Sequence, residues 1–321
     1  MRRHSLSTAL LLFAFAPPAL AADCFDRSLA VARYHYVNPG NIADNWQEIY
    51  QLTLSGGTVT KSTRLTKGAI SSPRYDSSAP VYSPDGAHIA YVESDAGGAN
   101  ARLKLMEAMD ADQDLQGDNP VVLDDTDVDI TLVAWGPGDR LAYGKFDGNG
   151  DTQIASAILS AGGLGTITLH TSDADYPDSF AFVAADMLVY DADGQSLKHI
   201  DLTNNTITLL SGPTPRDRTP TASPNSAEIF HTRIVGSTLD LWKATLASGP
   251  SLTAQQSVLA TSGMNEASVA LSPDGLCLAY LAGDLSITYG PNSDLWIQDL
   301  ETGAIQQITA SRDLAAVAWK P

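Results

Sequence analysis

Short runs in which apolar and polar residues alternate recur along most of the chain. In residues 294–299, for example, Leu295, Ile297 and Asp299 alternate with Trp296 and Gln298. A period of two is typical of β-strands, whose successive side chains point to opposite faces. No segment shows a sustained helical period, so the pattern predicts an all-β protein.

One hairpin sequence occurs twice almost unchanged. Residues 79–91 read Ala-Pro-Val-Tyr-Ser-Pro-Asp-Gly-Ala-His-Ile-Ala-Tyr, and residues 269–280 read Val-Ala-Leu-Ser-Pro-Asp-Gly-Leu-Cys-Leu-Ala-Tyr. Proline presets φ for a turn, and glycine accepts the positive φ that follows. A hairpin that returns far along the chain, with weaker copies between, indicates a repeat architecture.

The turns set the period of the repeat. They begin at Ser83, Gly136, Ser223, Ser272 and Lys320, at intervals of 53, 87, 49 and 48 residues. The long interval spans two repeats, with a copy that lacks the proline at residues 180–190. A period of this length with four short strands is typical of a β-propeller blade.

The predicted strands group into five complete blades and two fragments. The complete blades use strands at 79–82, 88–92, 102–106 and 121–123; 130–135, 141–145, 152–158 and 165–170; 179–183, 187–190, 196–201 and 206–210; 219–222, 228–233, 239–245 and 256–259; and 267–271, 276–282, 294–299 and 304–309. Strands at 28–37, 48–54 and 61–66 lack a first strand, and residues 313–321 supply one. We predict a six-bladed propeller of four-stranded antiparallel blades, with the ring closed by the C-terminal strand joining the N-terminal blade.

These repeats resemble those of the TolB-type, WD40-like propeller family. The similarity lies in the Ser-Pro-Asp-Gly hairpin, in strands such as Asp-Leu-Trp-Ile-Gln-Asp-Leu at 294–300, and in Gln-Ile-Thr at 307–309. The resemblance covers nearly all of residues 23–321 and implies a periplasmic interaction protein rather than an enzyme. TolB-type proteins also carry an N-terminal α/β domain, which we do not expect in this sequence.

The N-terminus has the features of a signal peptide, which we place at residues 1–22. Arg2 and Arg3 form a basic region, residues 10–16 are apolar, and Ala19-Leu20-Ala21 fits a cleavage site. No later stretch approaches the roughly 20 apolar residues of a spanning helix. We therefore expect a single propeller domain, residues 23–321, that is periplasmic or secreted and monomeric.

The charge of the chain limits its partners. Its 37 acidic and 19 basic residues give a formal net charge of −18, which argues against nucleic acid and anionic membranes. A basic partner, bound cations or simply a well-solvated acidic surface all fit this charge. The two cysteines, Cys24 and Cys277, can pair in an oxidising compartment, or Cys277 can be a free core residue.

Charged residues recur where each innermost strand begins, about seven residues before each turn. Loops that enter these strands surround one mouth of a propeller channel, so we expect their side chains to converge there. The candidates are Asp76, Asp129, Asp175, Tyr176, Arg216, Asp217, Asn265, Glu266, Arg312 and Asp313, with Arg74 and Arg218 as further counter-charges. They can bind a basic partner segment, hold Ca²⁺ through oxygen ligands, or cap the local turns.

Two further acidic stretches have ligand types at alternate positions, Asp147–Asp151 and Asp110–Asp114. Both lack the sixth-position glycine and twelfth-position glutamate of an EF-hand loop. A polar hairpin connection explains them better than a surface calcium site, although calcium stays a candidate cofactor.

The sequence contains no recognisable catalytic set. It has no Gly-x-Ser-x-Gly, His-Glu-x-x-His or phosphate-loop motif, and His35, between two tyrosines, is the histidine of most interest. The leading hypothesis is a binding module for an envelope protein or peptide that uses the channel mouth. The alternative is a metal-dependent lyase or hydrolase acting on a sugar or lactone in the central channel.

Overall fold

The structure is a computed structural model, and strands form nearly all of its regular elements. It describes residues 23–36, 45–67, 75–95, 98–114, 116–125, 129–146, 151–161, 163–171, 177–223, 227–261, 264–284 and 292–321. The predicted signal peptide, residues 1–22, lies outside the described residues. A short 3-10 helix, η3 (Pro137–Asp139), occupies one turn. Nowhere in the described part is there a helix long and apolar enough to cross a membrane.

Four sheets each use strands that follow one another in the chain and pair antiparallel. Three of them have four strands: β4 (Tyr75–Tyr82), β5 (His88–Asp95), β6 (Arg102–Glu107) and β7 (Val121–Asp124); β13 (Pro177–Ala184), β14 (Met187–Ala192), β15 (Ser196–Asp201) and β16 (Thr206–Leu209); and β17 (Asp217–Ala222), β18 (Glu228–Val235), β19 (Thr238–Leu246) and β20 (Leu252–Leu259).

The fourth sheet differs at its outer edge. It contains β8 (Ile130–Trp135), β9 (Arg140–Phe146), β10 (Thr152–Ser160), β11 (Gly163–Leu164) and β12 (Thr168–Leu169). Two short strands, β11 and β12, both pair with β10, so the prediction of one continuous outer strand at 165–170 is wrong. Glycine at positions 163 and 165 explains the break, because glycine weakens a strand.

The fifth sheet has eight strands and joins the two ends of the chain. It contains β1 (Ser28–His35), β2 (Trp46–Ser55), β3 (Thr58–Arg64), β21 (Met264–Leu271), β22 (Cys277–Asp284), β23 (Ser293–Asp299), β24 (Ile305–Gln307) and β25 (Leu314–Trp319). The last strand, β25, pairs antiparallel with β1 from Leu29–Trp319 to Arg33–Leu314. Its ladder with β23 consists of a single residue pair, Ser293–Leu314.

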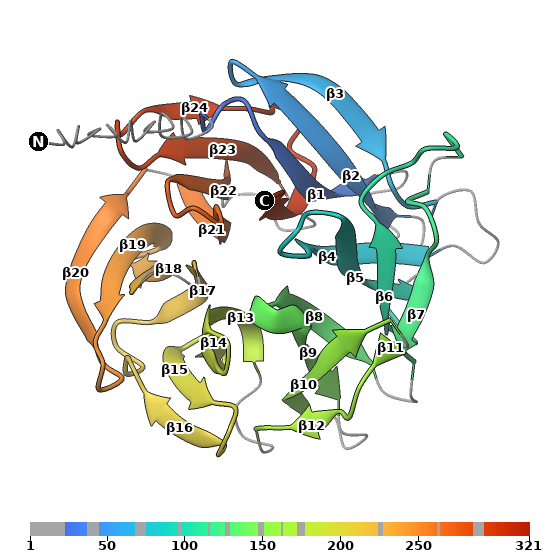
Figure 1. The fold of residues 1–321 in the computed structure, drawn as a ribbon. Coiled ribbons are helices and arrows are strands. Elements are labelled where there is room, and N and C mark those ends of the chain that lie inside the picture. The colour runs from blue at the N-terminus through green and yellow to red at the C-terminus, as the bar shows by residue number, and fades with distance from the viewer. Residues whose placement is uncertain are drawn as a thin grey trace, which may run out of the picture.

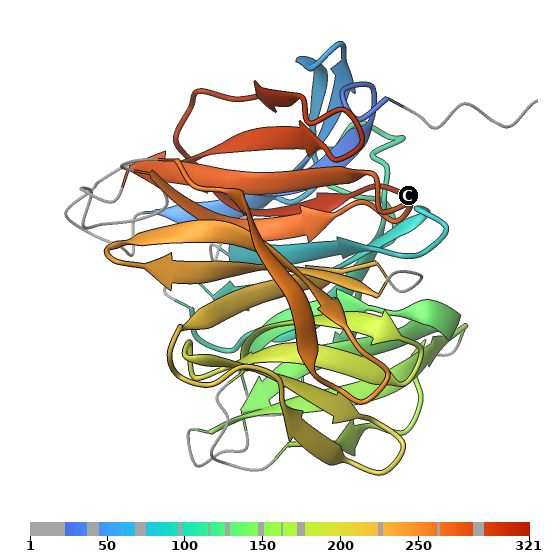
Figure 2. The same cartoon turned by 90° about the vertical axis from the view of Figure 1, so that its left-hand side faces the viewer.

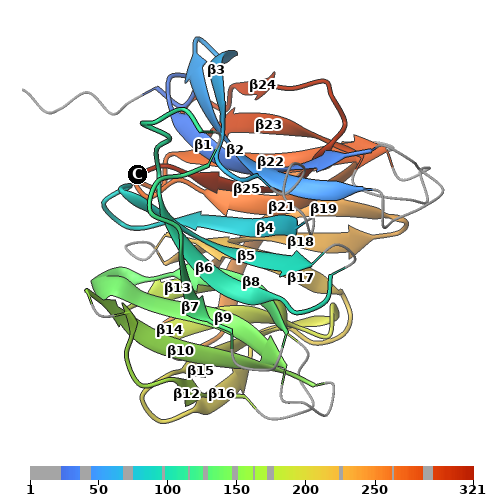
Figure 3. The ribbon, with the colours of Figure 1, turned by 90° about the vertical axis from the view of Figure 1, so that its right-hand side faces the viewer.

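The sheets are arranged radially around a centre (Figure 1). Strands β4, β8, β13, β17, β21 and β25 lie innermost, while β3, β7, β12, β16, β20 and β24 lie at the periphery. The two side views show the strands running between two end faces, with the C-terminus at one of these faces (Figures 2 and 3). This radial arrangement confirms the prediction of an all-β propeller built from antiparallel sheets.

The hydrophobic core lies between neighbouring sheets and follows the repeat. The second strand of four repeats carries Leu or Ile, then one residue, then a fully buried tyrosine: Tyr91, Tyr143, Tyr190 and Tyr280. The sheet of β17 to β20 has the buried His231 at the same place. Each sheet covers one apolar face with its neighbour, so burial of these side chains stabilises the ring as a whole.

The conspicuous Ser-Pro-Asp-Gly turns hold the chain through their own side chains. Ser83 Oγ donates to Asp85 Oδ1 at 2.5 Å and accepts the N–H of His88 at 2.9 Å. The second copy repeats this, with Ser272 Oγ donating to Asp274 Oδ1 at 2.6 Å. The motif is therefore a local clamp for the turn.

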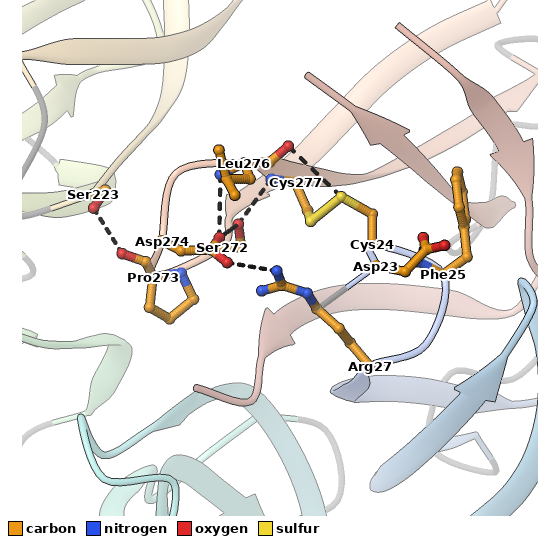
Figure 4. Close-up of polar contacts among 10 residues, drawn as sticks. All are labelled: Asp23, Cys24, Phe25, Arg27, Ser223, Ser272, Pro273, Asp274, Leu276 and Cys277. Carbon is orange, nitrogen blue, oxygen red and sulfur yellow. Dashed lines mark hydrogen bonds and ion pairs between the residues drawn. A yellow bond between two sulfur atoms is a disulfide. The ribbon is translucent and has the colours of Figure 1, made fainter. Parts of the chain in front are cut away.

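A disulfide fixes the N-terminal segment to the second turn (Figure 4). Cys24 and Cys277 are bonded across 253 residues of chain, with their Cα atoms 5.5 Å apart. Arg27 reaches the same turn and forms an ion pair with Asp274, Nη2 to Oδ2, at 2.5 Å. Both sulfur-bearing side chains are buried in the cluster between β1–β2 and β21–β23.

Candidate binding site in the central channel

The innermost strands surround a cavity of about 850 Å³. Every one of the six, β4, β8, β13, β17, β21 and β25, contributes to its wall. The cavity is thus the central channel that the repeat architecture predicts, and its volume is in the range of ligand sites in proteins.

Small side chains form one layer of the channel wall. One equivalent wall position, near the end of each innermost strand, carries Val81, Ala134, Ala181, Thr221, Ala270 and Ala318. No charge and only one hydroxyl occurs in this layer. A ligand in the channel therefore meets a mainly apolar wall with room for its own side chains.

Three innermost strands carry the same backbone irregularity at the channel wall. Ala79, Thr219 and Ser268 have φ of 47°, 43° and 48°, and each lies at a register shift of its ladder. Positive φ is uncommon for residues other than glycine and costs of order 1 kcal/mol or more. Bulges of this kind redirect neighbouring side chains, and here they lie just inside the end of the channel where the innermost strands begin.

Three of the predicted mouth residues accept hydrogen bonds from a neighbouring sheet. Asp76 Oδ1 accepts the N–H of Gln47 at 2.8 Å, and Asp129 Oδ1 accepts the N–H of Ala101 at 3.0 Å. Asn265 Oδ1 accepts the N–H of Leu239 at 2.8 Å. In each case the donor begins the third strand of the preceding repeat. These side chains therefore clamp neighbouring sheets, and a role in binding stays a prediction.

The remaining described candidates also have local roles. Asp313 forms an ion pair with Arg33, Oδ2 to Nε, at 2.6 Å, and the main-chain N–H of Arg312 donates to Asp294 at 2.9 Å. The side chain of Arg216 is exposed, while its carbonyl accepts the N–H of Ile234 at 3.0 Å. None of the described candidates is among the residues that line the cavity. Asp175, Tyr176 and Arg74 lie outside the described residues.

Two of the candidates are wholly buried. Asp217 and Glu266 have no exposed surface. Burial, with a smaller effect of Asp240, raises the pKa of Glu266. Burial also acts to raise the pKa of Asp217, but His231 and Arg233 outweigh it and hold that pKa below its usual value. Both residues are thus parts of buried polar networks between strands.

The charged residues at the channel itself were mostly missed from the sequence. Asp178 is the one carboxylate among the described residues that line the cavity, and its side chain is 56% exposed. Arg218 lies beside it, and Asp191 lies behind, almost fully buried. Asp178 occupies the second position of its innermost strand, as Arg218 does in the next repeat. Arg218 was among the counter-charges predicted from the sequence, and a search for polar residues at that position, rather than two residues earlier, would also have found Asp178.

Asp191 is the most strongly shifted carboxyl group near the channel. Burial raises its pKa to about 6, although the N–H of Thr219 and the charge of Arg218 act in the opposite direction. The folded protein therefore binds a proton at Asp191 more tightly than the unfolded chain does between about pH 4 and pH 6. The contribution of this proton to the free energy of unfolding is largest below pH 4 and is lost as the pH rises through about 6.

Replacement of Asp191 with asparagine is expected to stabilise the protein at pH 8 by about 1 to 3 kcal/mol, because it removes a buried charge whose pKa is raised by about two units. At pH 4 the gain should vanish. Urea unfolding of both proteins at the two pH values measures this difference. A variant that is less stable than the wild type at pH 8 would contradict the assignment.

The predicted acidic stretch at 110–114 forms part of the connection between β6 and β7. Asp110, Asp112 and Asp118 bring carboxylate oxygens within 4.8 Å of one another. Asp114 instead forms an ion pair with Lys67. The oxygens suit a hard cation, and calcium binding here remains a prediction. In the other stretch, residues 147–150 lie outside the described residues.

One hydrogen-bonded chain has the order of a catalytic triad. Ser156 Oγ lies 2.7 Å from His170 Nε2, and His170 Nδ1 lies 2.6 Å from Asn205 Oδ1. Ser156 is 1% exposed and does not line the channel. Since a nucleophile must reach its substrate, we interpret this chain as a polar link between the β10 and β15–β16 sheets. His35, the histidine of most interest in the sequence, lies 3.1 Å from the buried Glu48.

The fold is similar to that of TolB-like β-propellers. TolB from Acinetobacter baumannii superposes with a TM-score of 0.68 at 16% identity, over 93% of this chain and 68% of that one. A putative TolB from Agrobacterium tumefaciens gives 0.61 at 15% identity, over 92% and 99%. A puromycin hydrolase gives 0.55 at 16% identity, over 84% of this chain and 42% of that one. These likenesses concern the fold.

The sequence itself matches no model of a known protein family and no curated protein. The TolB-like fold is therefore established by structure, as the repeat pattern predicts, while the biochemical role must be argued from the channel.

Proposed function

We propose that this protein is an exported six-bladed propeller that binds a segment of a partner protein in its central channel. The observation that carries the proposal is one mainly apolar cavity that all six innermost strands line, with a layer of small side chains contributed by each of them. An extended peptide is long, thin and variable in its side chains, and an apolar channel of this size accommodates one. The TolB-like fold supports an interaction role.

The count of six blades rests on dividing the eight-stranded sheet. Strands β21 to β24 form one group of four, and β25 with β1 to β3 forms another. The two groups share a single ladder pair, Ser293–Leu314, whereas β25 and β1 share an antiparallel ladder from Leu29–Trp319 to Arg33–Leu314 with one register shift. With this division each blade supplies one strand to the channel, and strands from both ends of the chain close the ring.

The chemistry of the wall supports binding over metal-dependent catalysis. Among its described residues, Asp178 is the one acidic side chain, and histidine and cysteine do not occur. Catalytic metal sites use several such ligands. Peptide binding needs only a shaped apolar surface with a few polar groups that set orientation. The net negative charge favours a partner segment with basic character.

The proposal predicts that a bulky residue in the channel abolishes partner capture. Ala181 lines the channel on β13, so Ala181→Trp should narrow it and reduce recovery of a partner from an envelope extract by at least about tenfold. Ile207→Trp is the matched control, because Ile207 is exposed on the outer strand β16. Circular dichroism verifies that both variants fold. Equal recovery by Ala181→Trp and the wild type would refute channel binding.

A further inference from the structure

Three charged side chains meet at the edge of the channel, where β13, β14 and β17 are neighbours. Asp178 lines the channel, and Arg218 lies between it and the buried Asp191. The cluster holds two carboxylates and one guanidinium. It therefore carries one negative charge in excess when all three groups are ionised.

Arg218 is held loosely between its two acidic neighbours. Its Nη2 lies 3.7 Å from Asp178 Oδ2, and its Nε lies 3.9 Å from Asp191 Oδ2. Both separations exceed the 2.7–3.2 Å or so of a good hydrogen bond. The guanidinium packs over Gly194, where a Cβ atom would collide with it. The arginine thus balances part of the negative charge, but it forms no close hydrogen bond with either carboxylate.

Two oxygen atoms in this region have no hydrogen-bond partner among the described residues. One is Oδ1 of Asp191, a side chain that is 1% exposed. The other is the buried Oγ of Ser179, a residue next to Asp178 that is among those surrounding the channel. Burying polar atoms without partners is costly. The burial that raises the pKa of Asp191 to about 6 still leaves it ionised at pH 7.5.

We propose that this cluster receives a primary ammonium group, a lysine side chain or a free amino terminus, carried by an apolar segment in the channel. An ammonium is compact and offers three donors, which suits the exposed carboxylate of Asp178 and the shared charge of Asp191 behind it. The small apolar wall beyond takes the attached segment. This inference rests on the proposed function, because the same channel holds the ligand.

A pair of simple probes tests the ammonium preference. Octylammonium and octan-1-ol share an apolar tail and differ in the charged head group. At pH 7.5 and low salt, titration calorimetry should show the wild type binding octylammonium at least about tenfold more tightly than the alcohol. Asp178→Asn should bring that ratio close to one. Glu301→Gln removes an equal charge from an exposed turn and should leave the ratio unchanged.

The outcomes separate this inference from the proposed function. Equal affinity for the two probes, a preference that survives Asp178→Asn, or no binding of octylammonium would each overturn the ammonium site. If partner capture still fails in Ala181→Trp while the probes show no preference, the channel remains the binding site and only its charge specificity is wrong. If Ala181→Trp captures the partner normally, the proposed function itself fails.

Discussion

Replacement of both cysteines, Cys24→Ala with Cys277→Ala, is expected to lower the free energy of unfolding by about 4 to 5 kcal/mol. The bond joins residues 253 positions apart, so without it the unfolded chain regains the entropy of a very long loop. Chain-entropy arguments assign about 5 kcal/mol to a loop of this size, and removal of native disulfides commonly costs about 2 to 5 kcal/mol. Both side chains are also buried.

The loss should be specific to the covalent bond. Denaturant unfolding of the wild type in the presence of a reductant should reproduce most of the loss in the double variant. Arg27→Gln removes the partly exposed ion pair to Asp274 next to the bridge and should cost less than the double variant, about 1 kcal/mol. A double variant as stable as the oxidised wild type would show that the bond contributes nothing to stability.

Replacement of Asp217 with asparagine is expected to cost about 3 to 5 kcal/mol, because it leaves the Arg233 guanidinium buried without its counter-charge. Arg233 Nε and Nη2 donate to the two oxygens of Asp217 at 2.6 and 3.0 Å. The guanidinium also lies 4.3 Å from the ring centre of Trp242, and Nη2 donates to Gln255 at 2.5 Å. The arginine therefore cannot move to solvent without breaking several contacts.

Removing both charges provides the matched control. The double variant Asp217→Leu with Arg233→Met should recover much of the loss, because a buried pair is often replaceable by apolar residues. Neighbours hold the pKa of Asp217 below its usual value, so its contribution is present at neutral pH and is lost as the pH falls through the folded pKa. The difference between Asp217→Asn and wild type should thus shrink in acid. A constant difference from pH 7 to pH 2 would contradict this.

The repeat could be predicted from the sequence because its turns are local. Ser83 and Asp85 close their turn through bonds within five residues, and alternation along 294–299 predicts β23. The broken outer strand formed by β11 and β12 was not predicted, since it depends on which residues reach β10. The pairing of β25 with β1 was expected from an orphan strand at the C-terminus.

The charged groups at the channel were harder to predict because a β-bulge lies between the start of the innermost strand and the turn that follows it, as in β4 and β17. Counting residues back from the turn therefore does not give the side of the strand to which a side chain points. Asp76 and Asp129 recur at the predicted interval, but their carboxylates accept hydrogen bonds from the main chain of the preceding sheet. Asp178 and Arg218 lie two positions further along their strands and reach the channel edge. Asp191 comes from the neighbouring strand, so its contact with Thr219 is visible only in three dimensions.

Photo-crosslinking from inside the channel tests the central claim most directly. Benzoylphenylalanine replaces Ala318, which lines the channel on β25, and in a second variant replaces Ile207 on the outer strand β16. After irradiation in an envelope extract, mass spectrometry should find one partner peptide bonded to position 318 and none enriched at position 207. Crosslinks that form only at position 207, or equally at both positions, would contradict binding in the channel.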